Sequence, residues 1–182
     1  MAGKRELLLE DVGRILALAA ASVDPQPVYR ALQQIAAETI GWRLFTILRY
    51  VPEHQAVERL HSSDASAYPV GGRKPLAKIW ASHAAMERGD VFLAATPDDV
   101  RQAFFDHELI FSLGITAILN VPIRHAGRRL GTLNLCGEEG MYGAREVACG
   151  KVLAGLLAPL LLAGLAPAPP VCRPRGETEG CD

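Results

Sequence analysis

The chain has 182 residues, with 19 Lys and Arg against 20 Asp and Glu, a formal net charge of −1, and 49% hydrophobic residues. This is the composition of a globular chain, and its length favours a single domain that buries a core without disulfides or metals. The balanced charge, without a basic stripe or a run of like charges, argues against a nucleic-acid partner.

The first third of the chain predicts two helices and a hairpin. Residues 6–21 place apolar side chains on one helical face. Asp24 and Pro25 have the pattern of an N-cap followed by the first helical residue. Residues 44–51 are β-branched and aromatic and predict a strand, and residues 57–61 predict its antiparallel partner. The apolar face of the first helix consists of Leu8, Val12, Ile15, Leu16 and Ala19.

The middle of the chain predicts a long loop and short elements. Residues 62–75 are rich in turn formers, and a long loop in a compact domain is often functional. A short helix is expected from residue 76 to about residue 89, followed by an extended piece over 91–93. Thr96 and Pro97 predict the start of another helix. That helix is expected to carry Val100, Phe104 and His107 on one face.

The last third predicts a second hairpin and a final helix. Two apolar runs, 115–123 and 129–136, are joined by a short polar turn. The final helix is expected over 144–165, so that one domain covers residues 1–166 and a disordered Pro- and Gly-rich tail covers 167–182. The element order predicts an α+β fold: a central antiparallel sheet, with terminal helices on one face and loops plus short helices on the other.

Cysteine spacing and the uncharged segment near the C-terminus indicate where in the cell the protein is expected. The four cysteines contain no C-x-x-C pair, which argues against a zinc site and favours reduced thiols in a cytoplasmic protein. Residues 152–171 have no charge and are long enough to span a membrane. Prolines within and after this segment shorten its helical part, so we expect a core or interface helix and no membrane anchor. The cysteines are Cys136, Cys149, Cys172 and Cys181.

Two neighbouring motifs carry a family resemblance. Residues 113–123 have the sequence Leu-Gly-Ile-Thr-Ala-Ile-Leu-Asn-Val-Pro-Ile, and after Gly127 residues 130–135 have the sequence Leu-Gly-Thr-Leu-Asn-Leu. This resembles the C-terminal core of GAF domains, and residues 24–62 look like the opening helix and hairpin of that family. The resemblance covers roughly residues 8–165. It implies a GAF/PAS-like sheet with a pocket on its loop face, in a small-molecule sensor or dimerisation module.

The special chemistries of that family are tested by single residues. The Asn-Lys dipeptide typical of cyclic-nucleotide binding does not occur, and residues 1–135 contain no cysteine for a covalent bilin. Residues 62–118 lack the cysteines of the free methionine-(R)-sulfoxide reductases. His107 is a formal haem ligand, although a histidine with ordinary hydrogen bonds on a helix face is the simpler interpretation. Since no nucleophile elbow or phosphate loop occurs either, we expect a protein that is not an enzyme.

Asn120 and Asn134 lie in two otherwise apolar strands. A hairpin loop of odd length, such as residues 126–128, places them directly opposite each other on one face, whereas an even-length loop breaks the pairing. Buried amides need partners. The two amides therefore either satisfy each other or a nearby loop, or they contact a ligand.

Further candidate ligand contacts are aromatic or basic. Tyr68 lies beside glycines in the long loop, and a pocket is expected between the sheet and residues 62–109. Each candidate has an alternative role, as a core side chain for the aromatic residues and as a solvated charge for the basic ones. The other candidates are Trp80, Phe92, His107, Arg73 and Lys74.

The final helix also predicts a homodimer. Between residues 152 and 165 it has no charged residue on any side, whereas a surface helix normally shows a polar face. Its leucines exceed what one sheet face covers, and exposed apolar area of that size marks an interface. The first helix, through Leu8, Val12 and Ile15, is the expected second contributor. The alternative function is an interaction module whose pocket is filled by side chains.

Overall fold

A computed structural model describes residues 3–164, together with their side chains except those of residues 80–82. The expected domain boundary at residue 166 and the expected tail over 167–182 lie outside the described residues.

A six-stranded antiparallel sheet in the order β3-β2-β1-β6-β5-β4 forms the centre of the domain. The two long hairpins predicted from the sequence, β1–β2 and β5–β6, are joined side by side through β1 and β6. The α+β fold is therefore confirmed. The strands are β1 (Leu44–Val51), β2 (Ala56–Ser62), β3 (Arg73–Pro75), β4 (Phe92–Ala94), β5 (Ala117–His125) and β6 (Arg128–Gly137).

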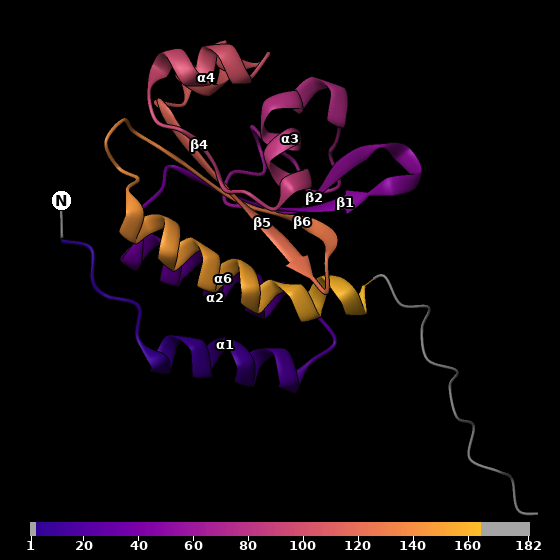
Figure 1. Cartoon of the computed structure of the whole chain (residues 1–182). Coiled ribbons are helices and arrows are strands. Elements are labelled where there is room, and N and C mark those ends of the chain that lie inside the picture. Colours follow the sequence, from indigo (N-terminus) through magenta and orange to yellow (C-terminus); the bar gives the residue numbers. More distant parts are fainter. Residues whose placement is uncertain (1–2, 165–182) are drawn as a thin grey trace, which may run out of the picture.

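Helices divide between the two faces of the sheet, as Figure 1 shows. The terminal helices α1 (Leu9–Ala21), α2 (Gln26–Thr39) and α6 (Ala144–Ala163) lie on one side, with α1 as the outermost layer. The helices α3 (Trp80–Arg88), α4 (Pro97–Ala103) and α5 (His107–Ser112) belong to the segment between the hairpins, on the other side. Two 3₁₀ turns complete the connections, η1 (Pro52–His54) and η2 (Leu76–Ile79).

Alternation along β6 explains why its sequence is apolar almost throughout. Leu133 and Leu135 point to the helical layer and are fully buried there. Thr132, Asn134 and Cys136 point to the opposite face, where they are also buried. Because successive side chains of a strand point to opposite faces, a strand covered on both sides needs buried residues at every position.

The final helix α6 is the main cover of the helical face. It is long and apolar enough to cross a membrane by length and composition, with a mean hydropathy of 1.7. Here Leu153, Leu157 and Leu161 are buried in the core formed with α2 and the sheet. The other leucines of the helix, Leu156, Leu160 and Leu162, are partly buried against the same core, and the position matches the predicted core helix.

The outer helix α1 differs from its sequence pattern. Ile15 is fully buried, but Leu8 and Leu16, which belong to the predicted apolar face, are 47% and 53% exposed. Leu7 and Leu18 pack against the core instead. The helix lies on other helices rather than on the wide sheet, so only a narrow stripe is covered.

The turn between β5 and β6 corrects the predicted loop. The loop has two residues, Ala126 and Gly127, both with positive φ (47° and 75°), as in a type I′ hairpin turn. An even loop would misalign the asparagines, but a bulge at Leu130 restores the register, so that Ile123 pairs with Gly131. The predicted pairing is therefore right, and its predicted cause is wrong.

A second bulge separates two neighbouring side chains of β2. Ile47 pairs with His61 and Leu48 with Arg59, which leaves Leu60 as the extra residue. His61 therefore faces α2, where its Nε2 lies 2.7 Å from Gln33 Oε1. Without the bulge, Arg59 and His61 would share one face of the strand.

The buried position of His61 predicts a pH-dependent stability. The residue is 8% exposed, its ring packs against Phe45 and Tyr29, and burial lowers its pKa from the ordinary 6.5. The unfolded chain therefore takes up a proton that the folded protein does not. The contribution of neutral His61 to the free energy of unfolding is fully present above pH 6.5. It is lost as the pH falls from there toward the lower pKa of the folded state, with a slope of at most about 1.4 kcal/mol per pH unit.

Thermal melts between pH 7.5 and pH 5.5 test this expectation. We expect His61→Gln to flatten the slope, while His54→Gln, an exposed histidine in the β1–β2 turn, keeps it. Equal slopes in the wild-type protein and His61→Gln would contradict the assignment.

Candidate functional site

A cavity of about 80 Å³ lies on the face of the sheet opposite the terminal helices. Its floor is formed by β1, β2, β5 and β6, and its remaining walls by the long loop, η2, α3 and the α4–α5 segment. Most of the wall is apolar, and a few polar groups converge on it, which is the usual make-up of a small-molecule site. The apolar side chains include Leu44, Val57, Ile79, Met86, Phe104 and Ile118.

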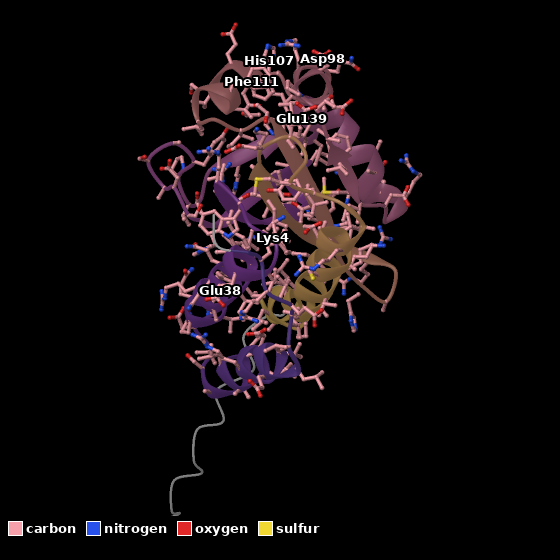
Figure 2. All side chains as sticks on the ribbon, turned by 90° about the vertical axis from the view of Figure 1, so that its left-hand side faces the viewer. Lys4, Glu38, Asp98, His107, Phe111 and Glu139 are labelled. Carbon is pink, nitrogen blue, oxygen red and sulfur yellow. The ribbon has the colours of Figure 1, made fainter. Side chains whose placement is uncertain are left out.

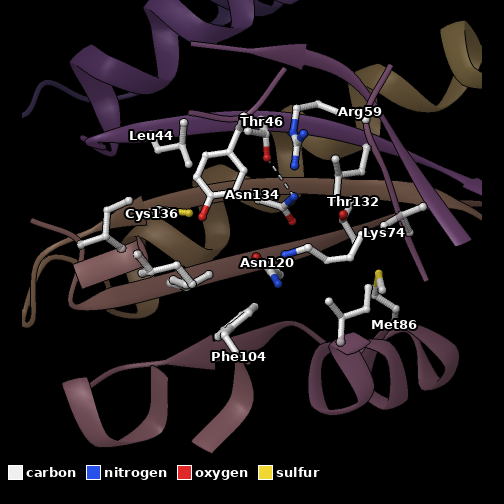
Figure 3. A pocket seen from close by; sticks show the side chains of 18 residues that line it. Leu44, Thr46, Arg59, Lys74, Met86, Phe104, Asn120, Thr132, Asn134 and Cys136 are labelled. Atoms are coloured by element: carbon white, nitrogen blue, oxygen red, sulfur yellow. Dashed lines mark hydrogen bonds between the residues drawn. The ribbon is translucent and has the colours of Figure 1, made fainter. Parts of the chain in front are cut away.

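A row of side chains crosses the floor of this cavity. Asn120 pairs directly with Asn134, and Asn134 pairs with Thr46, so all three side chains point to the same face. Figure 3 shows the row, with the asparagines at its centre. Phe92 continues it on β4, opposite Asn120.

The two asparagines are not hydrogen-bonded to each other. Asn134 Nδ2 donates to Thr46 Oγ1 at 3.1 Å. The Oδ1 atoms of Asn120 and Asn134 are buried and have no partner among the described residues. Each residue is only 7% exposed, so the cavity contains two unsatisfied acceptors. An unsatisfied buried polar group destabilises the folded protein by about 1–3 kcal/mol. In native structures such groups are rare and are found at functional sites.

The long loop places an aromatic and a basic side chain over the cavity. Asp64 Oδ1 accepts hydrogen bonds from the backbone of Ser66 and Ala67, at 3.0 and 3.1 Å, and so forms the turn that leads to Tyr68. The Arg59 guanidinium lies 5.0 Å from the centroid of the Tyr68 ring. Both side chains line the cavity.

Two further charged groups meet at the side of the cavity. Lys74 Nζ donates to Asp106 Oδ2 at 2.9 Å, and both side chains are mostly buried. The other oxygen, Asp106 Oδ1, has no partner among the described residues. Arg73, the second basic residue predicted near this loop, instead pairs with Glu58 at 3.2 Å.

A cysteine that sequence reasoning did not assign to the pocket also lies in this wall. Cys136 pairs with Ile118 and Leu44 across the sheet and lines the cavity. Burial raises the pKa of its thiol to about 12. At neutral pH the group is therefore a neutral thiol, which behaves as a small apolar side chain rather than a nucleophile.

The other predicted site residues have different positions. Phe92 is half-buried and stacks edge-on against Phe104, with ring centroids 6.0 Å apart, so it supports the cavity wall from behind. Trp80 is the first residue of α3, and its side chain lies outside the described part of the structure. Of the six predicted contacts, the structure therefore brings Tyr68, Asn120 and Asn134 together in the cavity.

His107 is separated from these residues because the predicted helix is broken. Thr96 caps α4 as expected, accepting from the Asp99 backbone N–H at 3.2 Å, but α4 ends at Ala103. Phe104 has an extended backbone (φ −126°, ψ 122°), which turns its ring into the cavity wall. His107 begins α5, so it does not share a helix face with Phe104.

The hydrogen bond and ring contact of His107 are both to neighbouring residues of the α4–α5 segment, which fits a structural role. Its Nδ1 lies 2.9 Å from the Phe104 carbonyl oxygen, and its ring packs on Phe111 with centroids 5.9 Å apart. Figure 2 shows both rings at the outer end of the domain. Within residues 3–164, no group of three or more His, Cys, Asp or Glu side chains is arranged to hold a metal ion.

The geometry predicts a small coupling between the two asparagines. We expect Asn120→Ala and Asn134→Ala to change the free energy of unfolding almost additively, with a coupling below about 0.5 kcal/mol, because neither amide is the other's hydrogen-bond partner and alanine adds no new contact between the two positions. Chemical denaturation of both single variants and the double variant measures this quantity. A coupling above about 1 kcal/mol would instead identify a mutually satisfied structural pair.

Comparison with known proteins establishes the family. The sequence profile of the GAF domain matches residues 22–161, and the chain belongs to the GAF domain family. GAF domains typically sense or bind small molecules and are generally regulatory rather than catalytic. No curated protein sequence matches this chain.

Solved structures share the fold at low sequence identity. The GAF domain of an Acinetobacter phosphoenolpyruvate-protein phosphotransferase has a TM-score of 0.69 at 12% identity, over 86% of this chain and 93% of that one. The corresponding Coxiella burnetii domain has a TM-score of 0.67 at 17% identity, over 87% and 96%. The free methionine-R-sulfoxide reductase of Neisseria meningitidis, solved with its substrate, has a TM-score of 0.68 at 14% identity, over 91% and 98%. These similarities establish the fold, and the site has to be argued from this chain's own residues.

Proposed function

We propose that this protein is a non-catalytic sensor that binds a small molecule in the cavity above the sheet and signals through a homodimer or a partner. The observation that carries the proposal is the pair of buried, unpartnered amide oxygens on Asn120 and Asn134. A domain that only served as an interaction module would gain stability from apolar residues at these positions. A ligand that donates hydrogen bonds to both oxygens would satisfy them.

The position of the cavity supports a signalling role. It lies between the rigid sheet and a segment made of short helices and a long loop, which includes Tyr68 and Phe104. Such short, loosely connected elements open at lower free energy than the central strands. Binding a ligand there would stabilise one arrangement of that segment over others.

A non-catalytic role agrees with the chemistry of the cavity. Cys136 is the cysteine that lines it, and the thiolate rather than the thiol is the reactive form. The raised pKa of this thiol therefore favours binding over the redox chemistry named for the Neisseria enzyme. The free thiols Cys136 and Cys149 are consistent with a cytoplasmic location, which is part of the proposal.

The proposed dimer uses the outer helical layer. Leu9 and Leu16 on α1 are 89% and 53% exposed, and Val152 on α6 is 44% exposed. The two helices run in the same direction in Figure 1, and Lys4, in the segment that precedes α1, forms an ion pair with Glu146 at 3.2 Å near the N-terminal end of α6. Exposed apolar residues on adjacent helices form the kind of patch that a second copy covers.

Native mass spectrometry of the purified full chain tests ligand binding directly. We expect a mass above that of the chain, which is lost on denaturation and lost in Asn134→Leu. Leu109→Glu is the matched control, since Leu109 lies exposed on α5 outside the cavity lining. A wild-type protein that shows the mass of the bare chain after gentle purification, and gains none with cell extract, would favour the interaction module.

A further inference from the structure

The charges around the cavity do not cancel. Arg59 and Lys74 line it, and Asp106 is hydrogen-bonded to Lys74. Arg59 forms no ion pair with any of the residues that the structure describes. One positive charge at the cavity therefore has no counter-charge, because the Lys74 charge is already offset by Asp106.

The acidic residue nearest to Arg59 in the sequence, Glu58, forms ion pairs with other arginines. Glu58 faces away from Arg59 on β2, where it pairs with Arg49 at 3.1 Å and Arg73 at 3.2 Å. Arg59 Nη1 donates to the Pro69 carbonyl oxygen at 2.9 Å, which fixes the guanidinium against the loop. Its Nε is buried and has no partner among the described residues.

The unsatisfied groups therefore have two complementary kinds. Arg59 offers a cationic donor whose Nε is buried, while Asn120, Asn134 and the second oxygen of Asp106 beside the cavity offer buried acceptors. In Figure 3, Arg59 and Lys74 extend from β2 and β3 toward the two asparagines. A guanidinium is the preferred partner of a carboxylate, and an amide oxygen accepts from a hydroxyl or N–H.

We propose that the ligand is a short organic monocarboxylate that carries a hydrogen-bond donor, such as a small hydroxy acid, with its carboxylate at Arg59 and its donor at Asn120 and Asn134. The inference rests on the proposed function and specifies its ligand class. A monoanion matches the single uncompensated charge, whereas a zwitterion would leave that charge in place. The cavity of about 80 Å³ is smaller than the enclosed cavity of about 150 Å³ that holds one benzene molecule, which favours a short ligand.

The first experiment needs no variant. Thermal melts and calorimetry of the full chain use glycolate and lactate, each with its neutral amide, and also acetate, propionate and inorganic phosphate. We expect at least one hydroxy acid to raise the melting temperature in a concentration-dependent way. We also expect its amide and the plain acid of the same length to bind at least about tenfold more weakly.

Variants then assign the two ends of the ligand. Arg59→Gln is expected to abolish the preference for the acid over its amide, and Arg59→Lys to retain part of it. Asn120→Leu is expected to abolish the preference for the hydroxy acid over the plain acid. Arg128→Gln, an exposed arginine at the β5–β6 turn, should leave both preferences unchanged.

Four results would overturn the assignment: equal binding of acid and amide, a response to phosphate alone, a response to none of the carboxylates, or an unchanged acid preference in Arg59→Gln. The proposed function is tested separately from the ligand class. If purified protein carries a neutral or cationic molecule that Asn134→Leu releases, the ligand class is wrong and the sensor function stands. If the protein carries no molecule and no probe binds, both proposals fail.

Discussion

Replacing Gly131 with alanine should destabilise the domain by about 3 kcal/mol or more, because the added methyl group has no space between the two central strands. A Cβ built on Gly131 would lie 2.0 Å from the Leu48 carbonyl oxygen and 3.0 Å from both Arg49 Cα and Leu161 Cδ2. The first two of these are backbone atoms of β1, the direct neighbour of β6. Relief of the clash therefore requires that the strands move apart.

The helix glycine Gly155 provides the matched control for this change. A Cβ there meets no atom within 4 Å, and the residue lies in the interior of α6. We expect Gly155→Ala to stabilise the protein by about 0.5–1 kcal/mol, since alanine is the better helix former. Denaturant titration measures both variants, and a Gly131→Ala protein within about 0.5 kcal/mol of the wild type would show that the strands yield easily.

This clash also gives a physical reason for the glycine in the motif on which the family resemblance rests. Gly131 follows the bulge at Leu130 and pairs with Ile123 and Arg49 on its two sides. The strand therefore needs a residue without a side chain where the backbone of β1 comes closest.

Introducing charge on the outer helix should separate the proposed dimer. We expect the double variant Leu9→Glu, Leu16→Glu to raise the dimer dissociation constant at least about 100-fold, because two apolar contacts become repelling charges at the symmetry-related face. Both side chains are exposed in the single chain, so the change removes little from the core. Light scattering at micromolar concentrations gives the mass of wild type and variant.

The control for this prediction lies on the other side of the sheet. Leu109→Glu adds one charge at a leucine that is 44% exposed on α5 and should leave the mass unchanged. A wild-type mass near 19.6 kDa at all concentrations would contradict the homodimer. Dissociation by Leu109→Glu would place the interface on the opposite face.

Local chemistry in the sequence determined much of the fold. The strand expected over residues 44–51 has those bounds, because its β-branched and aromatic run ends at Pro52. The helix start at Thr96 is also confirmed, since a cap needs only the residues next to it. The same local patterning placed Asn120 and Asn134 in neighbouring strands and Tyr68 in the loop above them.

The remaining features depend on contacts between distant parts of the chain. The bulges at Leu60 and Leu130 decide which side chains of β2 and β6 face the cavity, and hence that Arg59 lines it and His61 does not. A bulge is selected by strand pairing on both sides, which no short window of sequence contains. Arg59 was missed as a cavity residue for this reason, whereas Cys136 was within reach of strand alternation, because it lies two residues after Asn134 on the same face.

The break between α4 and α5 has the same kind of cause. Apolar spacing over residues 97–107 suits one continuous helix, but burying the Phe104 ring beside Phe92 and the cavity requires an extended backbone at Phe104. Helical periodicity indicates which apolar residues would share a face if the segment were one helix, whereas tertiary packing decides where each of them is buried. The sequence alone thus determined the sheet, its helical cover and the placement of the two asparagines in neighbouring strands, while the tertiary structure decided their register and the charge and shape of the cavity around them.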